Sequence, residues 1–191
     1  MTAPEAVNLA RTTIGARIGR CGPAVVVTAA VVSVVLRWWT LPLDAVALGA
    51  VTATLGILSV IDLREHRLPN AVVGPLTLAV VAFLAGHALA EAAPSALVPP
   101  LLTGLGASGL FYLGWWAGGL GLGDVKLVFP LVALLRWAGG GALTTAVAVT
   151  ALVGGVAAVG IMAGGRSRPR RMAYGPVLAA GAVAGLLVGP G

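Results

Sequence analysis

The stretch AVVGPLTLAVVAFLAGHALA, residues 71–90, decides the fold, because it runs for 20 residues without an aspartate, glutamate, lysine or arginine. An α-helix needs about 20 apolar residues to cross a bilayer. The whole chain shares this character: 59% of its 191 residues are hydrophobic, only 9% are charged, and the mean hydropathy is +1.01. A soluble domain has roughly a quarter of its residues charged. The composition therefore predicts an all-α integral membrane protein.

Further apolar runs predict a polytopic bundle of about six to seven transmembrane helices. They cover approximately residues 21–36, 43–61, 71–90, 97–119, 125–138, 141–163 and 175–189. The fifth and the seventh are short for a full crossing, so tilt or burial must help them. We expect residues 1–20 to form a polar cytoplasmic segment and residues 21–191 a single transmembrane domain. A cleavable signal peptide is the alternative interpretation of this N-terminus.

Basic residues gather at the ends of the apolar runs. They are Arg11, Arg17 and Arg20 before the first run, Arg64 and Arg67 after the second, and the cluster Arg166, Arg168, Arg170 and Arg171. Positive charge in short loops marks the cytoplasmic side of a membrane protein. With a cytoplasmic N-terminus, Asp62 and Asp124 fall at the same, inner face. The sequence pI of about 11.1 is then an orientation signal, and we expect no nucleic-acid partner.

The opposite face receives the remaining charges of the loops. The same topology leaves Asp44 and Glu91 outside, together with Arg37 and Arg136. Arg37-Trp38-Trp39 closes the first run and is typical of an interfacial aromatic belt beside a snorkelling arginine.

Two of the six acidic residues directly adjoin apolar runs. Asp62 closes ATLGILSVID, and Asp124 opens DVKLVFPLVALL. A single aspartate there is explained by a helix cap, but two on one face favour a site, because ionisable groups at membrane depth are costly. Two close carboxylates do not both ionise easily, so one takes a proton from water while the other donates to a carbonyl oxygen. The pattern predicts hydrolysis, and the assignment of base and acid stays open.

Glycines precede the second aspartate in a Gly-x-Gly-Asp pattern. Gly121 and Gly123 lack a Cβ, so they allow another backbone to approach closely and accept dihedral angles that other residues avoid. An extended substrate beside the acid of a protease needs such an approach, and a helix-breaking turn is the alternative. Dinucleotide and phosphate-loop fingerprints do not fit the stretch. Lys126 either tunes the carboxylate or binds lipid phosphate.

The sequence has few residues for disulfide, metal or nucleophilic chemistry. The single Cys21 excludes an internal disulfide and a multi-cysteine zinc site. His66 and His87 are too far apart for a metal site, and no serine–histidine or cysteine–histidine pair is evident. We therefore expect no metal and no cofactor.

Three segments together resemble the type IV prepilin peptidases, which are intramembrane aspartic proteases of the Gly-x-Gly-Asp class. They are IDLREHRLPN at 61–70, GLGDVK at 121–126 and AYGPVLA at 173–179. The first is similar to the family's first aspartate and the basic loop after it, and the second to Gly-x-Gly-Asp-x-Lys. The third is similar to the Phe-Gly-Pro-Phe-Leu-Ala that opens a late helix. The resemblance covers roughly residues 45–185.

This resemblance implies that Asp62 and Asp124 are the catalytic pair of an aspartic endopeptidase. It implies pilin-like precursors as substrates, cut on the cytoplasmic side of a prokaryotic inner membrane, between a basic leader and a hydrophobic helix. It also implies substrate-binding or site-shaping positions at Leu68, Pro69, Asn70, Gly121, Gly123, Lys126, Gly175 and Pro176.

The chain departs from the family pattern in two ways. It lacks the cytoplasmic insertion with paired Cys-x-x-Cys motifs, so it resembles the short, peptidase-only branch, which includes enzymes of Flp/Tad-type pili, and methyltransferase activity is not expected. Tyr174 replaces the usual phenylalanine. Val60-Ile61 before Asp62 argues against the presenilin branch.

Two other functions stay open at this point. A small transporter or proton-coupled carrier would use Asp62 and Asp124 as an ion relay. A catalytically dead scaffold subunit of a secretion complex would tolerate the loss of either carboxylate. The position of both acids at one face, away from the midplane, favours the peptidase.

Overall fold

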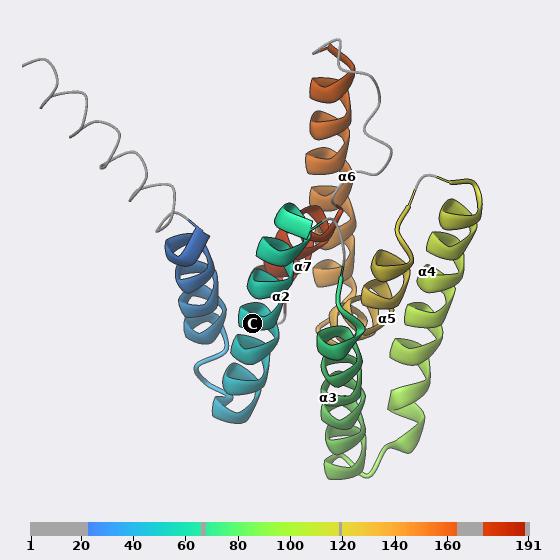
Figure 1. The fold of residues 1–191 in the computed structure, drawn as a ribbon. Coiled ribbons are helices and arrows are strands. Elements are labelled where there is room, and N and C mark those ends of the chain that lie inside the picture. The colour runs from blue at the N-terminus through green and yellow to red at the C-terminus, as the bar shows by residue number, and fades with distance from the viewer. Residues whose placement is uncertain (1–22, 66–67, 119, 164–173, 190–191) are drawn as a thin grey trace, which may run out of the picture.

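The computed structural model describes residues 23–65, 68–118, 120–163 and 174–189 (Figure 1). Every regular element in these ranges is a helix, as the composition predicts, and none is a strand. The polar segment 1–20, Cys21, His66 and the arginine cluster of 166–171 lie outside the described residues.

Seven α-helices follow one another in the described ranges. They are Pro23–Arg37, α2 (Pro42–Glu65), α3 (Asn70–Ala90), α4 (Val98–Trp116), α5 (Leu122–Trp137), α6 (Gly140–Ala163) and α7 (Gly175–Val188), with a 3-10 turn, η1 (Pro94–Leu97), before α4. Four of them, α2, α3, α4 extended by η1, and α6, are long and apolar enough to cross a membrane. The chain is thus a multi-pass membrane helical bundle.

The short helix α5 lies inside the bundle. It packs against α3, α4, α6 and α7 (Figure 1). Its buried side chains are Asp124, Val125, Leu127, Val128, Pro130, Leu131, Ala133, Leu134 and Leu135. A helix that is enclosed by other helices does not have to match the bilayer thickness with its own length. Burial therefore explains how α5 can lie within the membrane bundle although it has only 16 residues.

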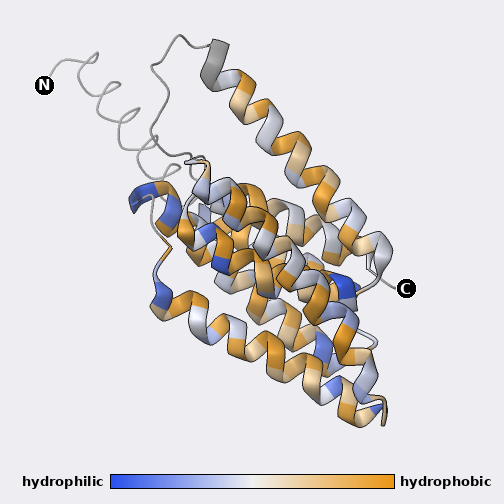
Figure 2. Cartoon of the chain, turned by 90° about the vertical axis from the view of Figure 1, so that its right-hand side faces the viewer, coloured by the Kyte–Doolittle hydropathy of each residue, from blue (hydrophilic) through white to orange (hydrophobic). Residues whose placement is uncertain are grey.

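The outer surface of the bundle is apolar. Large side chains such as Leu102, Leu110, Leu152 and Val156 are exposed on α4 and α6, and hydrophobic residues dominate the ribbon in Figure 2. In water such a surface would be costly, whereas lipid chains cover it without loss. The exposed residues mark these helices as the lipid-facing part of the molecule.

The end of the first helix is built differently from the interfacial belt that the sequence suggests. Trp39 is exposed, but Trp38 is buried and stacks on Trp137 with 5.6 Å between ring centroids. Arg37 Nη2 donates to the carbonyl of Gly189 at 2.6 Å, and Trp38 Nε1 donates to that of Leu186 at 3.0 Å. These carbonyls end α7 and have no partner within the helix, so Arg37 caps α7.

Candidate active site

Asp62 lies in the last turn of α2, at the junction with α7. Its side chain is only 5% exposed. Its Oδ2 accepts a hydrogen bond from the backbone N–H of Gly175 at 2.9 Å. Gly175 begins α7, and the first amides of a helix have no intrahelical partner and carry the positive end of the helix dipole. The start of α7 therefore fixes and stabilises the Asp62 carboxylate.

Gly175 needs to be a glycine because Asp62 lies against its Cα. A Cβ at this position would lie 2.8 Å from Asp62 Oδ2 and 3.2 Å from Asp62 Cβ. Pro176 follows within the first turn of α7, where its missing N–H costs no hydrogen bond. The structure thus brings the predicted site-shaping residue Gly175 directly to Asp62, and Pro176 is its neighbour in the chain.

Asp124 lies in the first turn of α5 and is also 5% exposed. Its Oδ2 accepts a hydrogen bond from the backbone N–H of Gly121, the N-cap residue, at 3.3 Å. This is the acidic half of a capping box. The helix-cap interpretation of this aspartate is therefore correct as far as it goes, but the cap is buried and faces a second acid.

The two carboxylates are neighbours in space although 62 positions separate them in the chain. Asp62 is near enough to Asp124 for their charges to interact. Each uses Oδ2 for its backbone donor, and in the described part of the chain neither Oδ1 has a hydrogen-bond partner. The arrangement leaves one oxygen of each acid to bind a water or a substrate carbonyl, which is what acid–base hydrolysis of an amide requires.

The segment before α3 packs on the start of α5, the helix that carries Asp124. A Cβ at Gly123 would lie 2.7 Å from Leu68 Cβ, so Leu68 packs directly on the first turn of α5. Pro69 follows in an extended conformation as the N-cap of α3. Lys126 Nζ then donates to Asn70 Oδ1 at 3.1 Å. The segments 61–70 and 121–126 are therefore in direct contact.

The glycines of the motif serve close approach and not unusual dihedral angles. Gly121 has φ −84° and ψ 144°, which any residue adopts. Among the described glycines, positive φ occurs at Gly118 and Gly139. The dihedral part of the sequence interpretation is thus wrong for Gly121, and the contact between Gly123 and Leu68 supplies the physical reason for the second glycine.

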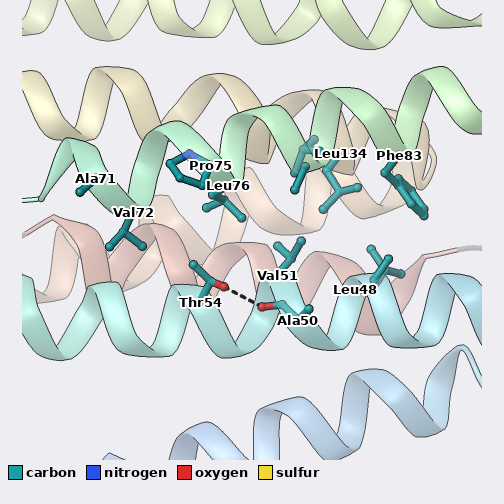
Figure 3. Close-up of a pocket in the computed structure, with 13 residues that line it drawn as sticks. Leu48, Ala50, Val51, Thr54, Ala71, Val72, Pro75, Leu76, Phe83 and Leu134 are labelled. Atoms are coloured by element: carbon teal, nitrogen blue, oxygen red, sulfur yellow. Dashed lines mark hydrogen bonds between the residues drawn. The ribbon is translucent and has the colours of Figure 1, made fainter.

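An apolar groove lies between α2 and α3 (Figure 3). Its volume is about 430 Å³, and its walls include Val51, Val72, Leu76 and Leu134. Thr54 is the most polar of the residues that line it, and its hydroxyl donates to the carbonyl of Ala50 at 2.8 Å. The groove offers no free hydrogen-bonding side chain and suits an apolar occupant.

A buried polar pair at the far end of α2 was not predicted from the sequence. Asp44 Oδ1 lies 2.8 Å from His87 Nε2, and the rings of His87, Phe83 and Trp137 pack against one another with 4.7–4.8 Å between centroids. Asp44 and Asp62 are 18 residues apart on one helix, which corresponds to about 27 Å along its axis. The pair is therefore not part of the candidate active site. In the described ranges no three histidine, cysteine, aspartate or glutamate side chains group as metal ligands would.

The fold and the site define a class of protein: a polytopic membrane bundle with two buried carboxylates together at one end. A sequence model of the type IV leader peptidase family matches residues 49–163, which include both Asp62 and Asp124 but end before Gly175. The chain belongs to this family, as the three segments predict, and is a multi-pass membrane peptidase. Comparison with curated proteins gives no match, and neither does comparison with solved structures.

Proposed function

We propose that the protein is an aspartic endopeptidase in which Asp62 and Asp124 together activate water. The observation that carries this proposal is the burial of both carboxylates, close enough for their charges to interact, each bonded to one backbone amide and each with an oxygen that accepts no hydrogen bond from a described residue. The pair shares one proton. The charged member takes a proton from water, the water oxygen bonds to the peptide carbon, and the protonated member donates to the carbonyl oxygen. As this tetrahedral intermediate collapses, the carbon–nitrogen bond breaks, the nitrogen takes the proton that came from water, and one hydroxyl returns its proton to the other aspartate as the carbonyl reforms.

The proposed substrates are pilin-like precursors, including those of Flp/Tad-type pili. Such a precursor carries a basic leader and a hydrophobic helix, and cleavage falls between them on the cytoplasmic side of the inner membrane. Membership of the leader peptidase family supports this substrate class. The apolar exterior of the bundle supports docking of a hydrophobic helix. We propose the peptidase activity alone, without methyl transfer.

The test is co-expression with a pilin-like precursor and measurement of the cleaved fraction by gel electrophoresis. We expect Asp62→Asn and Asp124→Asn each to abolish cleavage, because an amide cannot exchange the proton. Asp44→Asn is the matched control, since it changes another buried aspartate of α2 at the far end of the helix. Processing by both site variants at the rate of the wild type would overturn the proposal.

The ion-relay alternative has less support. Asp62 lies in the last turn of α2 and Asp124 in the first turn of α5, so both acids are at helix ends and not at mid-depth. A relay across the membrane places its ionisable groups along the path.

A further inference from the structure

A second groove opens between α3 and α4, at the same end of the bundle as the two aspartates. Both helices pack against α5, but in the described ranges they do not pack against each other, and they diverge toward the upper end in Figure 1. The residues that line the groove are Asn70, Val73, Gly74, Thr77, Leu78, Leu105, Ser108, Val125, Lys126 and Phe129. Its volume is about 730 Å³, larger than that of the groove between α2 and α3.

The mouth of this groove carries a positive charge. Lys126 is exposed and donates one hydrogen bond to Asn70 Oδ1. An ammonium group has three donors, so two remain, and the amide NH₂ of Asn70 adds two more. In the described ranges Lys126 forms no ion pair, with Asp124 or with another acid, and none of the residues that line the groove is acidic. Of the two roles that the sequence leaves open for Lys126, the geometry favours phosphate binding over tuning of the carboxylate.

Below the mouth the groove becomes apolar and faces the lipid. Leu78 is 72% exposed and Leu105 is 58% exposed, and Phe129 of α5 forms part of the floor. Leu78 lies eight residues after Asn70 on α3, which is roughly 12 Å deeper in the membrane. A cation at the surface above an apolar channel matches the order of groups in a phospholipid.

One polar atom in the groove has no protein partner. Ser108 Oγ is buried and makes no hydrogen bond with any described residue. Buried hydroxyls are nearly always paired, so an unpaired one calls for an explanation. Rotation of the Ser108 side chain toward the groove would bring this hydroxyl to an ester carbonyl of a glycerolipid, which would accept its hydrogen bond. The groove between α2 and α3 has no such unpaired hydroxyl, since Thr54 is bonded to Ala50.

We propose that this groove is a binding site for an anionic phospholipid. The phosphate binds Lys126 and Asn70, and an acyl chain lies along Leu78, Leu105 and Phe129. The site is separate from the proposed hydrolysis, because binding requires neither aspartate.

The headgroup is tested by native mass spectrometry of the purified full chain in detergent, titrated with phosphatidylglycerol or phosphatidylcholine. We expect wild type to bind phosphatidylglycerol in preference, and Lys126→Gln to reduce that preference about fivefold, the effect of one basic residue at an anionic membrane surface. Lys126→Arg should retain it. Arg136→Gln is the control, because Arg136 is an exposed cation of the same helix at the opposite end.

The groove itself is tested by filling it. Gly74 and Gly86 both lie on α3, and a Cβ at either would meet nothing within 4 Å, but only Gly74 lines the groove. We expect Gly74→Leu to weaken phosphatidylglycerol binding and Gly86→Leu to leave it unchanged.

Several results would overturn the site. They are equal binding of the two lipids by wild type, undiminished preference in Lys126→Gln, or an equal loss in Arg136→Gln. Displacement of the lipid by inorganic phosphate at the same concentration would indicate a free-anion site instead. All of these measurements are made without a precursor, so their failure leaves the peptidase proposal untouched.

Discussion

Asp62 and Asp124 illustrate how backbone amides at helix starts can hold two buried acids, since neither forms an ion pair with a basic side chain in the described ranges. Each carboxylate accepts a hydrogen bond from a backbone N–H at a helix start. The donor is Gly175 of α7 for Asp62 and the N-cap residue Gly121 of α5 for Asp124. Amides at helix starts have no other partner and point their positive ends outward. Two helix N-termini therefore hold the acids in place and leave one oxygen of each for chemistry.

Gly175→Ala is expected to damage the proposed activity while the bundle still folds. The new Cβ would lie 2.8 Å from Asp62 Oδ2, so the carboxylate must move. A misplacement of about 1 Å costs on the order of a hundredfold in rate when a reacting group is displaced. Precursor cleavage would measure the loss. Gly155→Ala is the matched control, since a Cβ there meets nothing within 4 Å, and an equal loss in both variants would contradict the explanation.

Substitutions of Asp124 should separate its two roles. Asn keeps an acceptor for the Gly121 amide, whereas Ala removes the cap, which costs about 1 kcal/mol of stability. We therefore expect Asp124→Asn to melt close to wild type and Asp124→Ala to melt lower, while neither cleaves a precursor. Thermal unfolding in detergent measures the difference. Equal melting of the two variants would mean that the capping bond contributes nothing.

Single site residues could be predicted from the sequence where their position carries a high energetic cost. An aspartate that adjoins an apolar run is expensive, so Asp62 and Asp124 stand out without a structure. The pair Asp44–His87 could not be predicted in this way, because it depends on the rotation of α3 against α2. The same holds for the contact between Gly123 and Leu68, which no local sequence pattern predicts.

At the scale of the helices, hydropathy locates the elements but not their polar ends. The run 43–61 predicts α2, yet α2 continues to Glu65, which puts Asp62 inside the last helical turn. Likewise α5 begins at Leu122, three residues before the predicted 125. Polar and glycine residues at a helix end carry no apolar signal, so the positions that matter for the site are those the pattern defines least.

Close packing of α6 on α7 depends on two glycines of α7. A Cβ at Gly181 would lie 2.7 Å from Ala146 O, and one at Gly185 would lie 2.5 Å from Ala142 O. Small residues four apart allow such an approach of two backbones in a membrane. The glycines thereby hold α7, and with it Gly175, in register with α6 and α2.

Gly181→Leu is expected to separate α7 from α6. Overpacking of a tight contact costs typically about 1–3 kcal/mol, so the variant should unfold at a lower temperature than wild type. Because α7 carries Gly175, precursor cleavage should fall as well. Gly155→Leu on α6 introduces the same side chain into open space and should change neither. Unchanged stability of Gly181→Leu would show that the two helices do not need the close approach.

For the molecule as a whole, the two ends of the bundle have opposite characters. One end holds the two aspartates and the exposed Lys126. The other end holds a cluster of aromatic rings around His87, together with Arg37 as the cap of α7. An apolar exterior separates the ends (Figure 2). The orientation of such a molecule in the membrane is defined by the end that faces the cytoplasm. The distribution of arginine predicts that the end with the aspartates faces the cytoplasm.

Orientation is testable with single cysteines in a Cys21→Ser background. Glu65 ends α2 beside Asp62, and Glu91 follows α3 at the other end, and both are exposed. We expect a membrane-impermeant maleimide to label Glu91→Cys in intact spheroplasts and Glu65→Cys only after permeabilisation. Leader cleavage before translocation of the precursor requires the site to face the compartment where basic leaders remain. Labelling of Glu65→Cys from outside would place the aspartates on the wrong side for that substrate, even if the pair is chemically competent.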